Sequence, residues 1–166
     1  MANRVIWAPG LGAGLTWSAL TYTGTPFNSL AGGSCVTNLT AITNGTAFDL
    51  YMDVSYTTVN GATTTTAASR AFCFLLPLNG DGTTYGDNSQ TLGTSTATNP
   101  VAGYQVGALG NKVGVASGTA LVNTFREIRL PPGTFVVGVV PNTEGALNAT
   151  ASANVWYRTY VENLNG

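Results

Sequence analysis

The sequence predicts an all-β protein, an antiparallel β-sandwich of the jelly-roll or a related Greek-key type with an extended N-terminal arm. Three observations support this fold class. Apolar and polar residues alternate with a period of two, β-branched runs are bounded by Gly, Pro and Asn, and no segment shows the period of an amphipathic helix. Because an isolated sheet would leave one apolar face in water, the strands need a second layer. An immunoglobulin-like sandwich is the alternative, since strand spacing does not reveal topology.

The clearest strand covers residues 48–56. Its apolar residues alternate strictly with the others, which places them on one buried face: Phe48, Leu50, Met52, Val54 and Tyr56. Ahead of it, Asn44-Gly45 supplies the positive-φ residues of a tight turn. We therefore expect residues 35–41 to be the partner strand of a hairpin.

Further strands follow at intervals set by turn residues. The apolar run 70–76 ends at Pro77, and residues 79–100 form a long loop of Gly, Thr and Asn. Two prolines and a glycine at 131–133 make another turn. The strands predicted in this part of the chain are residues 70–76, 104–106, 112–115, 121–130, 134–140 and 151–162. The chain therefore holds about seven to nine strands in a single domain.

Residues 1–33 differ in pattern from the sandwich predicted for residues 34–166. The apolar Ile6 and Trp7 precede a glycine-rich stretch, which is typical of an extended segment. This segment is either an arm that docks on a neighbouring subunit or an edge strand of the domain's own sheet. Aromatic residues tend to carry interfaces. The interface candidates at this end of the chain are Ile6, Trp7, Trp17 and Tyr22.

The last predicted strand has aromatic residues on both faces. Trp156 and Tyr160 share one face, while Val155, Tyr157 and Val161 share the other. One of the two faces belongs to the core, and the alternation alone does not say which.

Charged residues are scarce: 8% of the chain is Asp, Glu, Lys or Arg, compared with about 25% in an average soluble domain. The 26 Thr, 15 Asn and 21 Gly residues supply most of the polarity instead. Since soluble monomers rely on net charge to stay apart, a formal net charge of -1 indicates a surface that neighbouring subunits cover. The alternative is a secreted domain, or one whose composition has drifted.

The same composition argues against two classes of partner. A nucleic-acid-binding face needs a stripe of Lys and Arg, and the 6 basic residues form no such stripe. The longest apolar stretches, residues 72–76 and 135–140, have the length of strands and fall far short of the roughly 20 residues that span a bilayer. The first residues show no secretory signal. We expect neither nucleic acid nor membrane as a partner.

Catalytic residues are not evident either. The sequence has no histidine, which is the commonest general base and metal ligand, and the single lysine, Lys112, has no marked serine partner. Asp49 and Asp53 lie on one strand face about 13 Å apart, beyond the roughly 5–9.5 Å of a glycosidase pair. We interpret them as a solvated sheet face that faces Arg158 or Arg70 across strands. We expect no enzyme and no cofactor.

Two further features allow both a chemical and a structural interpretation. The loop beginning at Asn79 places amide and carboxylate oxygens at alternate positions, as calcium loops do, with Asn79, Asp81 and Asp87 as candidate ligands. It lacks a third acid and a terminal Glu, so a loop without an ion is favoured. Cys35 and Cys73 suffice for one disulfide, but Cys73 lies in an apolar strand, which favours a free core thiol.

With the strands placed, the chain resembles a small virion protein of a tailed bacteriophage, of the capsid decoration or cement kind. The resemblance rests on the Thr/Asn/Gly/Ala-rich polar faces, the Met-Ala-Asn start and the strand-turn-strand run of residues 125–135. It implies a non-catalytic sandwich on the outside of a capsid, commonly a homotrimer, that binds the major capsid protein. It also implies synthesis in the host cytoplasm and a final location on the virion.

Two other functions stay open at this point. Sandwiches with exposed Trp and Tyr bind sugars by stacking, and polar loops often line such sites, so a carbohydrate-binding module of a tail fibre or secreted protein is the main alternative. A small coat protein that assembles by itself is the third candidate, and the lack of a basic arm for genome contact disfavours it.

Overall fold

The computed structural model describes residues 4–9, 16–22, 24–38, 40–45, 49–61, 63–86, 96–97, 104–150 and 154–165. For residues 4–9, 96–97 and 162–165 the backbone alone is described. Within these ranges the chain forms strands and turns and contains no α-helix. The prediction of an all-β protein is confirmed.

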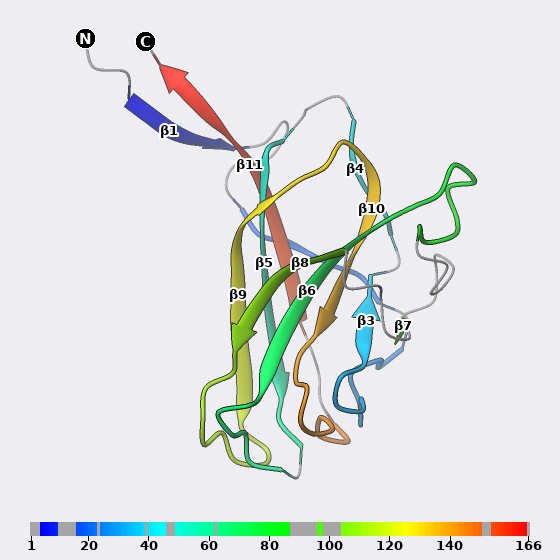
Figure 1. The fold of residues 1–166 in the computed structure, drawn as a ribbon, viewed down its shortest axis with the longest axis vertical. Coiled ribbons are helices and arrows are strands. Elements are labelled where there is room, and N and C mark those ends of the chain that lie inside the picture. The colour runs from blue at the N-terminus through cyan, green and yellow to red at the C-terminus, as the bar shows by residue number, and fades with distance from the viewer. Residues whose placement is uncertain are drawn as a thin grey trace.

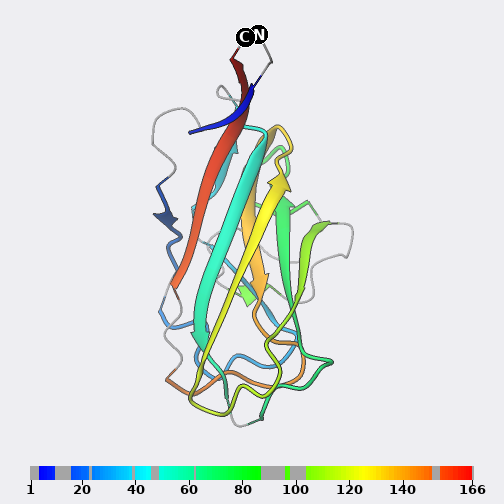
Figure 2. The ribbon, with the colours of Figure 1, turned by 90° about the vertical axis from the view of Figure 1, so that its left-hand side faces the viewer.

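Two antiparallel sheets pack face to face and hold the eleven strands found within the described ranges (Figures 1 and 2). The strands are β1 (Arg4–Pro9), β2 (Ser18–Ala19), β3 (Cys35–Thr37), β4 (Ile42–Asn44), β5 (Tyr51–Val59), β6 (Arg70–Pro77), β7 (Thr96–Ala97), β8 (Gln105–Gly110), β9 (Ala120–Arg129), β10 (Gly133–Val140) and β11 (Asn154–Asn165). Sheet A has the order β1-β11-β5-β9, with β2 paired to β11. Sheet B has the order β7-β3-β10-β6-β8, with β4 paired to β10. The antiparallel sandwich is confirmed.

The strands pair from the two ends of the chain inward. β1 and β2 pair with β11, β3 and β4 with β10, β5 with β9, and β6 with β8, always antiparallel. The partners run from Ile6 with Asn163 near the ends to Cys73 with Gly107 near the middle. The chain therefore makes one long ribbon that bends between β6 and β8. This ribbon folds over, so that β11 also pairs with β5 and β10 with β6.

The hairpin predicted from Asn44-Gly45 is wrong. Residues 35–41 contain β3, which lies in sheet B, whereas β5 lies in sheet A, so the chain crosses between the sheets here. The Asn44 side chain serves this crossing, because its Nδ2 donates to the carbonyl oxygens of Asp49 and Pro131 at 2.9 and 3.1 Å. The Asn-Gly pair marks a corner of the sandwich and not a hairpin turn.

The strand predicted at residues 112–115 is also wrong, because these residues form a turn. Gly114 has a φ of +78°, which glycine adopts without steric cost, and its N–H donates to the Thr65 carbonyl at 2.9 Å. The strands predicted after residue 69 otherwise correspond to β6, β8, β9, β10 and β11. Phe48, predicted to begin its strand, lies outside the described residues, as does most of the predicted loop 79–100.

Sheet B is covered on both faces, which explains the continuous apolar runs of β6 and β10. Its inner face faces sheet A and contributes Cys73 and Val137 to the main core. Its outer face carries a second cluster that includes Cys35, and Tyr85 lies fully buried on it, with its hydroxyl 2.8 Å from Thr37 Oγ1. Both cysteines are buried and neither forms a disulfide, so the interpretation as core thiols is confirmed.

At one end of the sandwich, β1 and the last part of β11 leave the body as a two-stranded ribbon (Figure 1). β1 pairs along residues 160–165, whereas β5 pairs along residues 154–160. The first strand is thus paired to the chain's own last strand, and Figure 2 shows this pair extending past the sheets. Docking of the ribbon on a neighbouring subunit stays a prediction.

The opposite end is held by neutral hydrogen bonds between buried amides. Asn111 Nδ2 donates to Ser69 Oγ at 2.8 Å, and the Ser69 hydroxyl donates to Asn142 Oδ1 at 2.9 Å. Asn142 Nδ2 donates in turn to Asn60 Oδ1 at 3.3 Å, and Asn123 Nδ2 donates to Asn111 Oδ1 at 2.6 Å. Because buried polar groups are costly unless they are bonded, these partners fix the loops without ionised groups.

Replacing Gly138 with Ala tests the packing of β10 against β3. A Cβ at this position would lie 2.7 Å from Cys35 Sγ, and its next neighbour would lie at 3.4 Å. We expect Gly138→Ala to lower the free energy of unfolding by about 1–3 kcal/mol through overpacking. In a Cys35→Ala background the sulfur is gone, so the same substitution should cost much less.

Equilibrium urea denaturation of the four proteins measures this cycle. Gly80→Ala is the control, because a Cβ there would meet nothing within 4 Å. Equal costs of Gly138→Ala in both backgrounds would contradict the packing.

Candidate interaction surface

Three surface features stand out in the described part of the chain: the outer face of sheet A, the turn at residues 78–86, and a hollow at the base of that turn. Across all the residues that the structure describes, no group of three or more His, Cys, Asp or Glu could hold a metal ion. No helix among them has the length and apolar character needed to cross a membrane.

The outer face of sheet A presents alternate residues of β5, β9 and β11 to the surface. Val155 and Tyr157 pack with the core, so the even-numbered residues of β11 point outward, and Arg158 lies opposite Asp53 of β5. This assigns the two faces of β11 that the sequence left open. The outer face of sheet A, as we use the term, comprises Trp17, Tyr51, Asp53, Ser55, Val122, Thr124, Arg129, Trp156, Arg158 and Tyr160.

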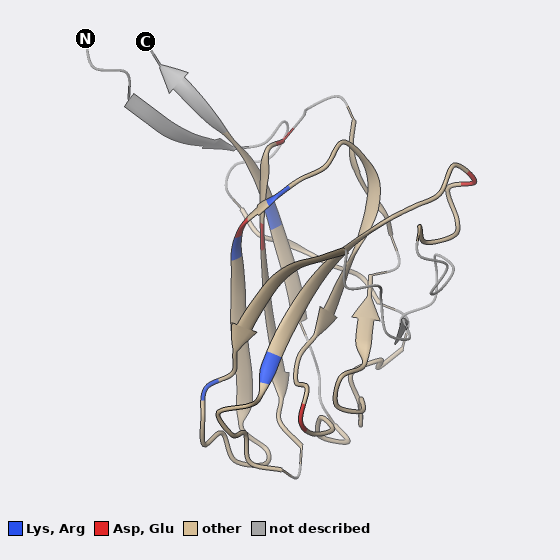
Figure 3. Cartoon of the chain, in the orientation of Figure 1, with Lys and Arg blue, Asp and Glu red and all other residues tan. Residues whose placement is uncertain are grey.

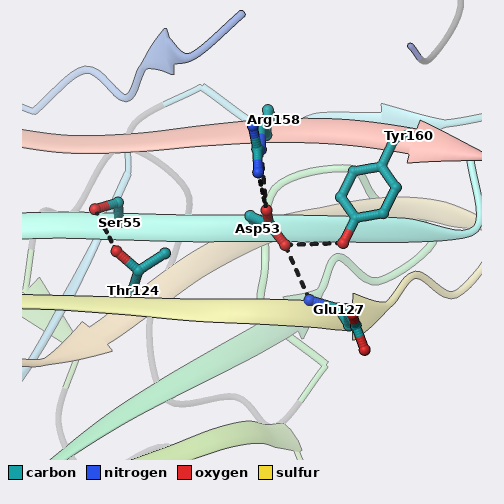
Figure 4. A network of polar contacts seen from close by, with 6 residues as sticks. All are labelled: Asp53, Ser55, Thr124, Glu127, Arg158 and Tyr160. Atoms are coloured by element: carbon teal, nitrogen blue, oxygen red, sulfur yellow. Dashed lines mark hydrogen bonds and ion pairs between the residues drawn. The ribbon is translucent and has the colours of Figure 1, made fainter. Parts of the chain in front are cut away.

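Asp53 is the centre of a polar network on this face (Figure 4). Arg158 Nη2 and Nε donate to Asp53 Oδ2 at 2.7 and 2.9 Å. The Tyr160 hydroxyl donates to Oδ1 at 2.9 Å, and the Glu127 N–H donates to the same oxygen at 2.9 Å. The predicted pairing of Asp53 with Arg158 is confirmed. The predicted solvation is wrong, since Asp53 is only 2% exposed, and Asp49 is buried too.

A β-bulge explains why a backbone N–H reaches this carboxylate. The register between β5 and β9 shifts around Asp53, because Met52 pairs with Ile128 but Val54 pairs with Phe125. The extra residue leaves Glu127 at a φ of +55°, a left-handed conformation that costs a residue with a side chain about 1–2 kcal/mol. The Glu127 N–H has lost its ladder partner at this bulge and bonds to Asp53 instead. Figure 4 shows the Glu127 carboxylate directed away from Asp53.

Aromatic rings cover the network. The Arg158 guanidinium lies 4.7 Å from the centre of the Trp17 ring, a cation–π contact, and the Tyr51 and Tyr160 rings stack at 5.8 Å. Burial and the hydrogen bond to Asp53 raise the pKa of the Tyr160 hydroxyl, so it stays a donor. Trp17 itself is 40% exposed, and Val122 on β9 is 60% exposed. The face therefore combines a fixed polar centre with exposed apolar groups.

The 78–86 turn projects from the other side of the molecule (Figure 1). Asp81 organises it: Oδ1 accepts the N–H groups of Thr83 and Thr84 at 2.8 and 2.9 Å, and Oδ2 accepts the Thr84 hydroxyl. Hydrogen bonds from Thr84 and then Thr83 lower the pKa of Asp81 to about 2, so it is ionised at neutral pH. Asn79 Nδ2 donates to Thr84 Oγ1 and to the Tyr85 carbonyl.

These bonds bear on the calcium-loop candidates. Inside the turn, hydrogen bonds engage both carboxylate oxygens of Asp81 and the amide nitrogen of Asn79. Asp87 lies outside the described residues. The turn is therefore held together by its own side chains, in the manner of an Asx turn.

A hollow of about 250 Å³ lies at the base of the turn. It is lined almost entirely by apolar groups: Leu75, Pro77, Tyr104, Val106, Pro131, Pro132, Thr134 and Phe135. Val106 is 38% exposed, so the hollow is open to the surface.

Two of the four predicted interface residues have described side chains, and these two lie in different places. Trp17 lies on the outer face of sheet A, whereas Tyr22 packs against the core, its ring 5.3 Å from that of Phe27. The Tyr22 hydroxyl is buried and has no hydrogen-bond partner among the residues that the structure describes, and burial raises its pKa. Ile6 and Trp7 lie in β1, where the backbone alone is described. Sequence reasoning missed the role of Asp53, although its pairing with Arg158 was the available signal.

Replacing Asp53 tests the network. We expect Asp53→Ala to lower the free energy of unfolding by about 3 kcal/mol, because it leaves Arg158 and the bulge N–H without their acceptor. Asp53→Asn keeps an acceptor for the N–H and removes the charge, so its loss should be smaller. Ser55→Ala on the same strand is the matched control and should cost about 1 kcal/mol, the value of a neutral hydrogen bond. Equal losses for Asp53→Ala and Ser55→Ala in urea denaturation would disprove the central role of Asp53.

Comparisons with known proteins return no relatives. No protein-family model matches the chain, and neither does a curated protein or a solved structure.

Proposed function

We propose that this chain is a non-catalytic structural protein of a virus particle, a capsid decoration protein that binds the outside of the shell and stabilises contacts between major capsid proteins. The observation that carries the proposal is the strand order. The strands pair from the ends inward. When β1 is counted with β2 and β3 with β4, only the β6–β8 connection begins and ends in the same sheet, which supports the jelly-roll form of the sandwich. Jelly rolls recur in viral capsid and lectin domains.

The surface chemistry supports a binding role. Only 8% of the residues are charged, and Trp17 and Val122 are exposed on one face. A protein that stabilises a shell acts by buried area across subunit seams, and interfaces of about 1,200–2,000 Å² suffice. Aromatic anchors surrounded by uncharged polar groups are the composition such interfaces use.

The rigidity of the loops supports the same role. The buried amides of Asn60, Asn111 and Asn142 bond to one another or to Ser69, and Asp81 fixes its own turn. Binding is weakened when loops must be ordered on contact, so surfaces that are already fixed lose less free energy on association.

Immunogold electron microscopy tests the proposal. Antibodies raised against the purified chain are applied to virus particles isolated by density gradient from the source culture. We expect gold on the outer surface of intact capsids, and dissociation of the chain should lower the temperature at which the capsids open. Gold confined to tail tips, or none in the particle fraction, would contradict a decoration protein.

Trp17 favours carbohydrate binding as a second candidate function. Its ring is 40% exposed and is held in place by the Arg158 guanidinium 4.7 Å from its centre, so it offers a fixed platform on which a sugar ring could stack. On a glycan array, a lectin-like module should bind a defined set of glycans, and Trp17→Ala should abolish that binding. Val122→Ala, on the same sheet face, is the control that should retain it. An array without any signal above background excludes this candidate.

A further inference from the structure

We infer that copies of this chain associate head to tail, with the 78–86 turn of one copy docked against the β9 side of the outer face of sheet A on the next. The inference rests on the proposed function, because head-to-tail association supplies the contact between copies of a virion subunit. It follows from the placement of the few charges and from the geometry of the two surfaces.

The turn offers a single negative charge at its tip. Asp81 is the one charged residue among residues 78–86, it is fully exposed, and its oxygens are fixed by Thr83 and Thr84. Figure 3 shows this acidic tip standing away from the body of the sandwich, with no other charge of the described residues near it. A carboxylate that accepts hydrogen bonds from its own turn keeps its full charge, so it can still attract a cation.

The outer face of sheet A offers the complementary charge. Arg126 and Arg129 lie exposed at the end of β9, with Glu127 between them. Arg158 is already neutralised by Asp53 at 2.7 Å. Among the described side chains at this end of β9, two exposed arginines therefore flank one exposed acid. Figure 3 shows the basic residues of β9 on the side of the sandwich opposite the turn.

The other charges whose side chains are described do not compete for this contact. Arg70 is the first residue of β6 and Lys112 follows the end of β8, and Figure 1 shows these strand ends far from the ribbon of β1 and β11. Glu144 accepts hydrogen bonds from Thr66 and faces Arg70. Asp49 is buried.

The geometry makes the contact intermolecular. The turn and the end of β9 lie on opposite sides of one copy, so they cannot meet within it (Figures 1 and 3). Two different surfaces that bind each other form a heterologous contact, which closes into a ring when the rotation between copies allows it. Apolar groups border both surfaces, Val122 on β9 and the hollow beside Val106 at the base of the turn, and they supply area to bury.

Charge reversal tests this contact in the full chain. Like charges placed face to face across an interface disfavour it strongly. We expect Asp81→Arg alone, and Arg126→Glu with Arg129→Glu alone, each to weaken self-association by about tenfold or more. The protein that carries all three reversals should regain association. Light scattering coupled to size-exclusion chromatography over a dilution series measures the mass against a monomer of 17.0 kDa.

Two controls separate charge from folding. Asp81→Asn keeps an acceptor for the Thr84 N–H, so it preserves the turn while removing the charge, and it should weaken association less than the reversal does. Arg70→Glu changes a charge at the far end and should leave the mass unchanged. Since the two β9 substitutions do not touch the turn, their effect cannot come from a misfolded turn.

Each outcome decides the inference. Loss of association in both single-side reversals with recovery in the combined protein supports the contact. A wild-type chain that is monomeric throughout the dilution series, or association that no reversal changes, overturns it. Immunogold labelling of capsids distinguishes the two proposals, because a chain that labels capsids but is monomeric in solution retains the decoration function and loses only this self-contact.

Discussion

Pairing from the two chain ends inward is the constraint on which the rest of this structure depends. Because β1 and β2 pair with β11 and the successive inner strands pair in turn, every sheet contact joins segments far apart in the sequence, except near the bend between β6 and β8. Loop-closure entropy is therefore lost before most contacts form, which is typical of slow-folding all-β proteins. The same pairing brings the first and last strands together as a ribbon at one end and leaves the 78–86 turn at the bend. The two surfaces that we assign to binding are thus consequences of one topology.

Within that topology, the buried carboxylate of Asp53 bonds to the backbone where the strand pairing is irregular. Asp53 lies at the bulge between β5 and β9, where it accepts the Glu127 N–H and pairs with Arg158 of the adjoining strand. Burying a carboxylate is favourable only when its partners are complete, and here four donors surround it. Elsewhere the chain uses amides, as the bonds of Asn111 and Asn142 show. Neutral side chains thus fix the loops at the end opposite the ribbon, while Asp81 fixes its own exposed turn.

The sequence predicted much of the fold because strand periodicity is local. Alternation in residues 48–56 correctly placed Met52, Val54 and Tyr56 on the inner face, but Leu50, predicted on the same face, is 42% exposed because it precedes β5. The β-branched run after residue 133 marked a strand buried on both sides. Which side chains cover a strand depends on residues far away in the sequence. Asp53 lies at a polar position of the alternating pattern, but Tyr160 and the Arg158–Trp17 pair cover it. The Asn44-Gly45 signal misled for a related reason, because the Asn44 side chain bonds to a carbonyl 87 residues away, at Pro131. Trp17 was predicted as an interface candidate from its residue type alone, whereas its contact with Arg158 required the structure.

The central claim is that this sandwich is a building block whose two opposite sides bind other subunits. Electron cryomicroscopy of intact particles that contain the chain tests it most directly. We expect sandwich-shaped density on the outer surface of the shell, arranged around a symmetry axis, with the 78–86 turn of one copy against β9 of the next. Particles whose outer shell lacks this density, or isolated copies that touch no neighbour, would contradict the claim.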